Sequence, residues 1–265
     1  MASTPPVVGP QLDPRAATTR STAARLLDGA GRATVVAYRE DAGRPHQVLA
    51  HGLTPADVLA VALPTACLAE GEGCHEVRLR IDQHGADPRL RVSTASVHTL
   101  AHLRLVEDVE LGRLAALGLL PTEVGWAAEA GARVALLALD RVLLHDQGGV
   151  TPLAFAELVC SDRFPHRSQE WLCHEIAQAV DDPAAVVAQV CAGDRAGVVG
   201  QGHPTPASVR PYVGETVLAD VDGTGCTWLR IDADRTRTVF VPFDAPVRDL
   251  DQLEAAVTGL GQPAV

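Results

Sequence analysis

Residues 216–243 read Thr216-Val-Leu-Ala-Asp220, Asp222-Gly-Thr-Gly225, Cys226-Thr-Trp-Leu-Arg-Ile-Asp232 and Thr236-Arg-Thr-Val-Phe-Val-Pro-Phe243. The three apolar-rich runs are separated by turn signals, a pattern typical of three antiparallel strands joined as a meander. Leu253, Val257 and Leu260 then recur at helical spacing. The stretch therefore predicts a small α+β unit of three strands and a helix, which needs a further surface to pack against.

Helical signals precede this sheet. Asp182 before Pro183 is an acidic N-cap followed by proline at the first helical position, which predicts a helix through Cys191. Residues 166–180 are also expected to be helical, whereas 193–212 are rich in glycine and proline and predict a long loop.

The N-terminal half is predicted to be a mainly antiparallel barrel with peripheral helices. Its clearest strand is 77–82, where Val77, Leu79 and Ile81 alternate with Arg78, Arg80 and Asp82. Helices are expected over 15–27 and 107–118, and further strands over 33–38, 47–52, 58–63, 90–106 and 133–145, the last almost continuous.

The composition excludes several classes of function. The chain of 265 residues has 22 basic and 33 acidic residues, a net charge of −11, so nucleic acids and anionic membranes are not expected as partners. All basic residues are arginine, and neither lysine nor asparagine occurs. Lysine Schiff bases and P-loop lysines are thereby excluded, and an anionic ligand must be held by arginine, histidine or backbone amides.

The six cysteines are scattered without a C-x-x-C pair, which favours reduced thiols. Cys67, Cys74 and His75 lack two further ligands at suitable spacing, so no structural zinc is predicted. Because a signal peptide and an apolar run of about 18 residues are also missing, we expect a cytoplasmic protein.

Two passages together resemble a known family. They are Leu136-Leu-Ala-Leu-Asp-Arg-Val-Leu-Leu-His-Asp-Gln-Gly-Gly-Val150, and Val217-Leu-Ala-Asp-Val-Asp-Gly-Thr-Gly225 with Thr238-Val-Phe-Val-Pro-Phe-Asp-Ala-Pro-Val247. The second resembles the D-x-x-G and R-x-x-F-x-x-P-V pattern that ends the domain-of-unknown-function-2470 (DUF2470) family. In that family a split β-barrel of the pyridoxamine-phosphate-oxidase or FMN-binding type comes first.

The resemblance implies a division of the chain and a ligand. Expected are a mobile tail over 1–14, a split β-barrel over 15–150, a connector over 151–165 and a DUF2470-like α+β domain over 166–265. Related proteins include bacterial heme-utilisation proteins that bind and degrade heme, and a plant plastid protein that binds glutamyl-tRNA reductase. They imply a homodimer whose partner barrel completes a tetrapyrrole or flavin site.

The sequence departs from this family at two places. The family's helical segment carries a histidine pair, but here His174 stands at or beside the first position and Val180 or Asp181 near the second. The family's pattern of basic and hydroxyl residues on neighbouring barrel strands, which binds the flavin phosphate, is likewise not matched clearly in this sequence. Whether the protein turns a substrate over is left open.

The candidate cofactor-binding residues are arginines and histidines of the predicted barrel, together with one helical histidine. They are Arg78, Arg80, Arg91, His98, His102 and His174. Residues two or four apart on a strand share a face, so His98 and His102 point the same way as candidate ligands of a heme iron. Arginines on that face would hold a propionate or phosphate. The alternative is a solvated outer face or a polar dimer contact.

Three functions follow from these observations. The first is a protein that binds heme or another tetrapyrrole and takes part in heme utilisation or degradation. The second is an FMN-dependent oxidoreductase, and the third is a regulatory interaction module without a cofactor. No catalytic residue is assigned, because the serines lack a G-x-S-x-G context.

Overall fold

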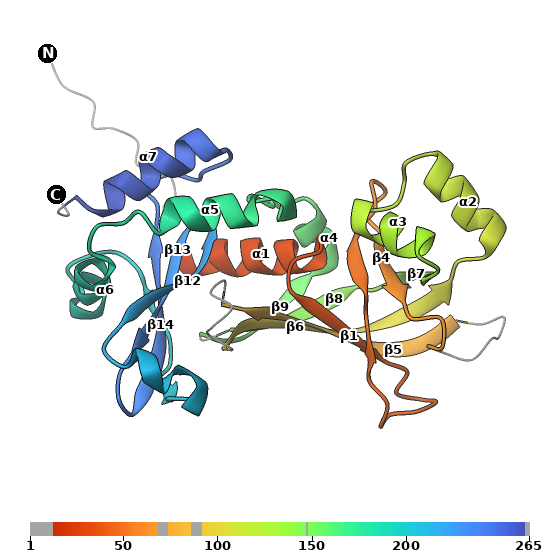
Figure 1. Cartoon of the computed structure of the whole chain (residues 1–265), viewed down its shortest axis with the longest axis horizontal. Coiled ribbons are helices and arrows are strands. Elements are labelled where there is room, and N and C mark those ends of the chain that lie inside the picture. Colours follow the sequence, from red (N-terminus) through yellow and green to blue (C-terminus); the bar gives the residue numbers. More distant parts are fainter. Residues whose placement is uncertain (1–12, 68–73, 86–91, 147, 263–265) are drawn as a thin grey trace, which may run out of the picture.

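The computed structural model describes residues 13–67, 74–85, 92–146 and 148–262, which form two antiparallel sheets with helices packed against them (Figure 1). The predicted tail over 1–14 therefore lies almost entirely outside the described residues. Helix α1 (Pro14–Leu27) contacts strands of both sheets. The mixed α and β class with antiparallel pairing agrees with the prediction.

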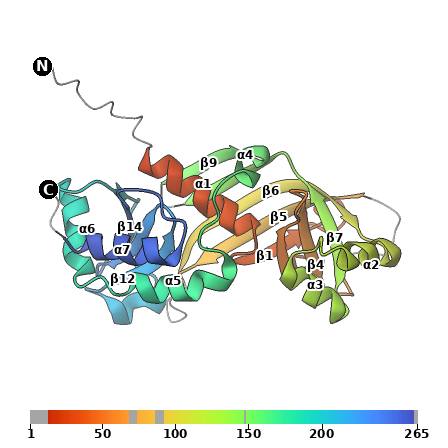
Figure 2. The same cartoon turned by 90° about the horizontal axis from the view of Figure 1, so that it is seen from above.

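The N-terminal sheet contains nine strands among the described residues, in the order β2-β1-β5-β6-β7-β4-β3, with β8 and β9 branching from β6. The strands are β1 (Arg32–Val36), β2 (His46–Gln47), β3 (Ala50–Leu53), β4 (Leu59–Leu63), β5 (Cys74–His84), β6 (Ser93–Leu105), β7 (Arg133–Ala138), β8 (Arg141–Asp146) and β9 (Gly149–Ala154). The long strands β5 and β6 lie side by side in the middle part of this sheet (Figure 2).

The two edges of this sheet come from one short segment. Strand β2 pairs with β1, strand β3 pairs with β4, and only Val48 and Leu49 separate them. The amide of Val48 donates to the carbonyl of Ala33, and that of Leu49 to Ala62. No ladder joins β2 to β3 among the described strands, so the sheet is curved but does not close into the barrel that the sequence predicted.

The predicted strand over 133–145 is divided in two. Strand β7 pairs with the C-terminal half of β6, and β8 pairs with its N-terminal half. At the junction, the hydroxyl of Thr99 donates to the carbonyl of Arg141 at 2.7 Å. The interruption lets β8 continue into β9, so the predicted connector over 151–165 begins as a strand and continues as a helix.

The C-terminal sheet has five strands among the described residues, and three of them form the predicted meander. They are β12 (Thr216–Asp222), β13 (Gly225–Ile231) and β14 (Arg235–Pro242), with the short strands β10 (Val198–Val199) and β11 (His203–Pro204) on β14. The loop predicted over 193–212 thus contains two short edge strands and a 3-10 helix, η2 (Ala207–Tyr212).

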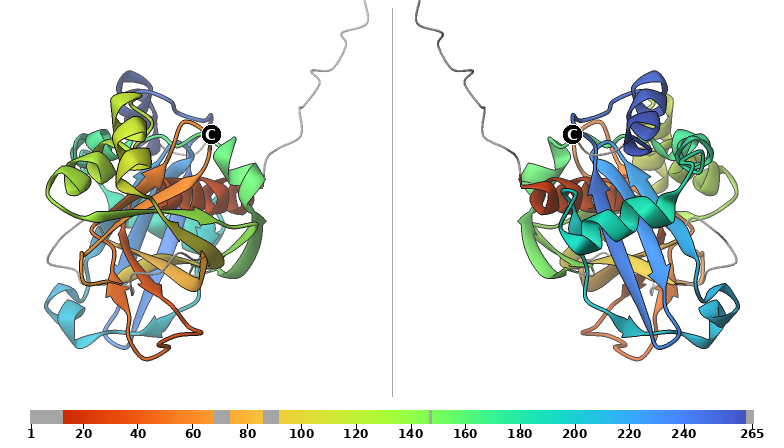
Figure 3. Two further views of the ribbon diagram at one scale, coloured as in Figure 1. Left: turned by 90° about the vertical axis from the view of Figure 1, so that its right-hand side faces the viewer. Right: turned by 90° about the vertical axis from the view of Figure 1, so that its left-hand side faces the viewer.

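Helices cover one face of this sheet. They are α5 (Glu170–Ala177), preceded by the 3-10 turn η1 (Arg167–Gln169), α6 (Pro183–Ala192) and α7 (Leu250–Leu260). Asp182 caps α6 by accepting from the amide of Ala185, as the Asp-Pro signal predicted. Leu253, Val257 and Leu260 of α7 are buried against the sheet. In Figure 3, right, α6 lies across the blue strands.

The remaining helices belong to the N-terminal sheet. They are α2 (Asp108–Ala116), α3 (Thr122–Glu129) and α4 (Phe155–Val159). Helix α2 was predicted, whereas α3 and α4 were not. Helix α3 is short and buries only Val124 completely, so its sequence carries little helical periodicity.

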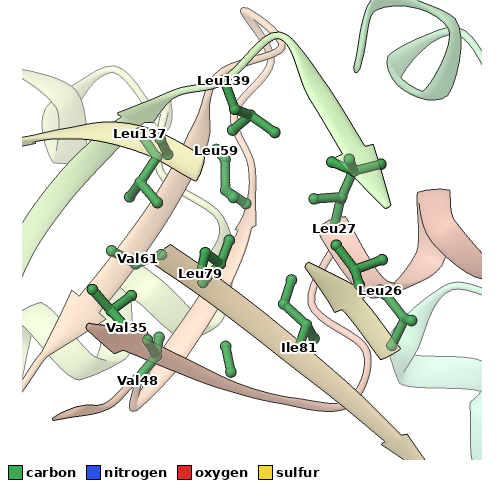
Figure 4. Packing of buried hydrophobic residues seen from close by; sticks show 14 of the residues in the cluster. Leu26, Leu27, Val35, Val48, Leu59, Val61, Leu79, Ile81, Leu137 and Leu139 are labelled. Carbon is green, nitrogen blue, oxygen red and sulfur yellow. The ribbon is translucent and has the colours of Figure 1, made fainter. Parts of the chain in front are cut away.

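Helix α1 contributes to the core of the N-terminal sheet. Leu26 and Leu27 are fully buried and pack with the inward side chains of β5, including Leu79 and Ile81 (Figure 4). Gly31, which follows the helix, has φ +76°, and a Cβ there would lie 2.6 Å from the carbonyl oxygen of Asp82. Only glycine permits this close approach between the helix and β5.

The first hairpin of the C-terminal sheet depends on Asp222. This side chain is buried, and its Oδ1 accepts from the amides of Thr224 and Gly225 and from the hydroxyl of Thr224. The turn predicted at Asp222 is therefore confirmed. None of the described helices has the length and apolar character needed to cross a membrane.

Stability should fall in acid because of His51 on β3. Its ring is buried and bonded to the carbonyl of Leu26 at 2.8 Å, and burial lowers the pKa of His51 to about 4. In the unfolded chain the pKa of His51 is near 6.5, so the unfolded state takes up a proton first as the pH falls. The contribution of the neutral, buried ring to stability is therefore complete above pH 6.5 and is lost as the pH falls towards 4. From pH 7 to 5 we expect a loss of about 2 kcal/mol in the free energy of unfolding.

Urea unfolding of the wild type and of His51→Gln at both pH values measures this loss. Glutamine keeps a hydrogen-bond donor but does not titrate, so the variant should show a pH dependence smaller by the same amount. Equal pH dependence in the two proteins would contradict the assignment.

Candidate functional site

The predicted arginines and histidines of the N-terminal sheet lie on its outer face. Strand β5 points Val77, Leu79 and Ile81 into the core, and therefore turns Arg78 and Arg80 outward. In the ladder with β6, Arg80 is paired with His98, Arg78 with Leu100 and Glu76 with His102. The alternation in the sequence thus correctly predicted a shared face for these residues.

His98 has a neighbour that the sequence did not reveal. The ring of His145, from β8, lies 4.4 Å from that of His98 between centroids, at an angle of 51°. Ser96 Oγ lies 3.0 Å from His98 Nε2 and holds the ring in place. The pairing of β6 with β8 creates this contact over more than 40 residues of chain, and local spacing carries no signal for it.

Exposed apolar side chains surround the two rings. Leu100 is 63% exposed, Leu143 39% and Val150 55%. Leu143 is paired with His98, and Val150 with His145. We call these five residues, His98, His145, Leu100, Leu143 and Val150, the imidazole patch. An apolar surface on an outer sheet face is typical of a ligand or partner contact.

The charges near the patch favour a neutral His98. Burial, then the neighbouring His145 and Arg80, lower the pKa of His98 below its ordinary value. Arg80 is bound to Asp82 at 2.8 Å, whereas Arg78 forms no hydrogen bond or ion pair with the described residues. At neutral pH His98 therefore keeps a lone pair, and the cation of Arg78 stands one strand away.

The other predicted site residues do not join this patch. His102 lies on the same face, but four residues along a strand separate it from His98 by about 13 Å. Two such side chains from one strand cannot bind one iron from opposite sides. His174 is on α5, buried in the C-terminal part, where its Nε2 accepts from the Gln178 amide at 2.8 Å. Arg91 lies outside the described residues.

His174 instead lines a cavity of about 110 Å³ between the two sheets, together with Arg25, Glu170 and Asp220. Arg25 is 4% exposed and donates to Asp220 in a short ion pair. Although burial lowers the pKa of Arg25, the nearby Asp220 and Asp222 outweigh it and raise the pKa overall. Burial also raises the pKa of Glu170 and of Asp222. Arg25, Glu170 and Asp220 thus form a charged cluster, although they come from distant parts of the sequence.

Within the described part of the chain, no group of three or more histidine, cysteine, aspartate or glutamate side chains is placed to hold a metal ion. A heme iron requires only one or two axial side chains, so the imidazole patch is the arrangement relevant to such a ligand.

Comparison with known proteins gives a limited result. No protein-family model and no curated protein matches the chain. A solved heme-binding protein from Mycobacterium smegmatis is 19% identical, with a TM-score of 0.47 over 97% of this chain and 98% of that one. A protein of unknown function from Agrobacterium tumefaciens is 15% identical, with a TM-score of 0.35 over 97% and 100%. These likenesses do not establish a family for the chain.

Replacing one member of the buried ion pair should destabilise the protein. In Arg25→Ala, Asp220 and Asp222 lose their cation in a buried setting, and the free energy of unfolding should fall by about 3–5 kcal/mol. The double variant Arg25→Leu with Asp220→Leu should lose less, because only Asp222, and no longer Asp220, is left without its cation. Urea unfolding measures both.

The matched control is Arg39→Ala, which removes an exposed arginine from its 2.6 Å contact with Glu76. An exposed pair is screened by solvent and contributes little to stability, so this variant should unfold almost like the wild type. A cost for Arg25→Ala no larger than that of Arg39→Ala would show that the pair does not stabilise the junction.

Proposed function

We propose that this chain binds heme or a related tetrapyrrole on the imidazole patch. The observation that carries the proposal is the pair of neighbouring imidazoles, His98 and His145, set among exposed apolar side chains on an outer sheet face. A porphyrin is a flat apolar disc with a metal at its centre and carboxylates at its rim. The patch offers imidazoles for the metal and apolar side chains for the disc, and the neighbouring arginines Arg78 and Arg80 complement the carboxylates.

The side chains present fit such a ligand. His98, held by Ser96 and favoured in its neutral form, would serve as the axial ligand, with His145 beside it as the second candidate. Arg78 and Arg80 on the adjoining strand would bind propionates, since a guanidinium forms bidentate bonds with carboxylates. When bound, the heme would supply a redox-active iron. His102 is too far along β6 to share that iron.

A second copy of the chain would cover the ligand. The patch leaves three large apolar side chains exposed on one sheet face, and a homodimer through this face would bury them.

We also propose that the N-terminal sheet has the fold of a split barrel of the FMN-binding type. The support is the segment 46–53, which pairs with both ends of the curved sheet.

Hemin titration of the purified protein tests the tetrapyrrole proposal. We expect a Soret shift that saturates at a fixed stoichiometry, with at least tenfold weaker binding for His98→Ala because the axial ligand is removed. His102→Ala is the matched control, being a histidine of the same strand and face, and should bind like the wild type. His145→Ala tests whether the second imidazole contributes.

Each outcome of this titration has a distinct meaning. Failure to develop a Soret shift would reject tetrapyrrole binding, and equal loss in His98→Ala and His102→Ala would reject this site. Flavin mononucleotide is added in a parallel titration. Binding of the flavin without hemin would favour the oxidoreductase alternative, and binding of neither would favour the interaction module.

The dimer proposal predicts that Leu100→Arg is monomeric. An added charge in the patch would have to be buried without a partner in the dimer, which is costly. Sedimentation equilibrium of the wild type should give twice the chain mass, and that of Leu100→Arg one chain mass. Leu117→Arg, on an exposed apolar residue at the end of α2, should remain dimeric. A monomeric wild type would contradict the proposal.

A further inference from the structure

Three arginines share one face of the C-terminal sheet, whereas the imidazole patch belongs to the N-terminal sheet. Arg230 lies near the end of β13, and Arg235 and Arg237 lie at the start of β14. Arg230 is directly opposite Arg237 in the ladder, so both side chains point to the same face. Arg235, two residues from Arg237, points there as well. The hairpin that carries them extends past α6 (Figure 3, right).

This arrangement leaves positive charge without a counterion. Like charges directly opposite each other on an antiparallel pair repel, because their Cβ atoms are only about 5 Å apart. The Nε of Arg230 lies 3.3 Å from a carboxylate oxygen of Asp232. Arg235 and Arg237, however, form no ion pair or hydrogen bond through their side chains with the described part of the chain. Three guanidiniums with one paired carboxylate leave two positive charges unmatched.

The guanidiniums of β14 are not covered by the neighbouring edge of the sheet. Gly202, between β10 and β11, lies against them, and a Cβ there would be 3.3 Å from Arg235 Cδ and from Arg237 Nε. A larger residue would place its side chain on these arginines. Because glycine has none, the two guanidiniums stay accessible to a ligand.

A hollow of about 230 Å³, partly open to solvent, adjoins the third arginine. It lies between α6, the start of β12 and the end of β13, and Arg230 belongs to its wall. The wall is apolar on the side of α6 and polar on the side of the strands. Its other side chains include Ala184, Val187, Ala188, Glu215, Thr216 and Asp232. A molecule held by the arginines at one end has room here for the other, where hydroxyl groups can donate to the carboxylates.

We propose that Arg230 and Arg237 bind the phosphate group of a small hydroxylated phosphate monoester. The two unmatched positive charges equal those of a phosphate monoester, which carries roughly −1.5 to −2 at neutral pH. Its three terminal oxygens can accept from two guanidiniums at once, whereas a lone carboxylate is satisfied by one. The net charge of −11 does not prevent this, because salt screens charges more than about 10 Å away. The site does not rest on tetrapyrrole binding.

Isothermal titration calorimetry of the full chain with glycerol 3-phosphate, at fixed ionic strength, tests the site. We expect saturable one-to-one binding. Inorganic phosphate should bind at least threefold more weakly, because it places nothing in the hollow, and acetate at least tenfold more weakly, because it carries one charge. Failure of both phosphates to bind saturably overturns the proposal, as does acetate binding as tight as that of glycerol 3-phosphate. Equal binding of the two phosphates rejects the role of the hollow.

Arginine variants locate the site. Arg237→Gln and Arg230→Gln each remove one guanidinium and keep a polar side chain, so each should weaken glycerol 3-phosphate binding at least tenfold. Arg113→Gln, on an exposed arginine of α2, is the matched control and should bind like the wild type. Unchanged binding in both variants of the sheet would place the anion elsewhere and overturn the assignment.

Urea unfolding gives a second readout, which begins without a ligand. Arg237→Gln removes the repulsion with Arg230, so the variant should unfold at the same urea concentration as the wild type or a higher one. A clearly lower midpoint would show that the protein itself satisfies this guanidinium. Glycerol 3-phosphate should then raise the midpoint of the wild type more than that of the variant, which corrects for the general effect of phosphate salts. Equal shifts would contradict the site.

Discussion

The ion pair between Arg25 and Asp220 joins the two halves of the molecule. Arg25 belongs to the helix that fills the core of the N-terminal sheet, and Asp220 to the first strand of the C-terminal meander. Because Arg25 is almost completely buried, its charge must be matched where it stands. The pair therefore fixes both how deeply α1 enters the junction and which face of the C-terminal sheet meets it.

Helix α1 can occupy this position because its faces differ. Leu26 and Leu27 enter the core, while a stripe of Arg15, Thr18, Thr22 and Arg25 at spacings of three and four residues lines the cavities facing the C-terminal sheet. The junction is consequently polar. It contains two cavities that share Gln83 and Asp220 in their walls, whereas the two apolar cores lie on either side.

The imidazole patch and the junction cavities differ in their relation to solvent. The imidazole patch is an open surface, whose ligand would be enclosed only by a second molecule. The junction cavities are hollows, partly open to solvent, whose walls come from both sheets and therefore depend on how the sheets dock. His174 belongs to the second environment, which explains why a histidine predicted with His98 is found away from it. Its helix packs on the C-terminal sheet, not beside β6.

The sequence alone determined the local elements: strict alternation over 77–82 predicted which residues face outward, Asp182-Pro183 predicted the start of α6, and three apolar runs predicted the meander. These signals are local, because side-chain periodicity and capping act within a few residues. Tertiary structure alone decided the partners. The contact of His98 with His145 requires the register of β6 on β8, and Arg25 meets Asp220 across 195 residues. Such contacts follow from how the elements pack in space, and no spacing along the chain encodes that packing directly.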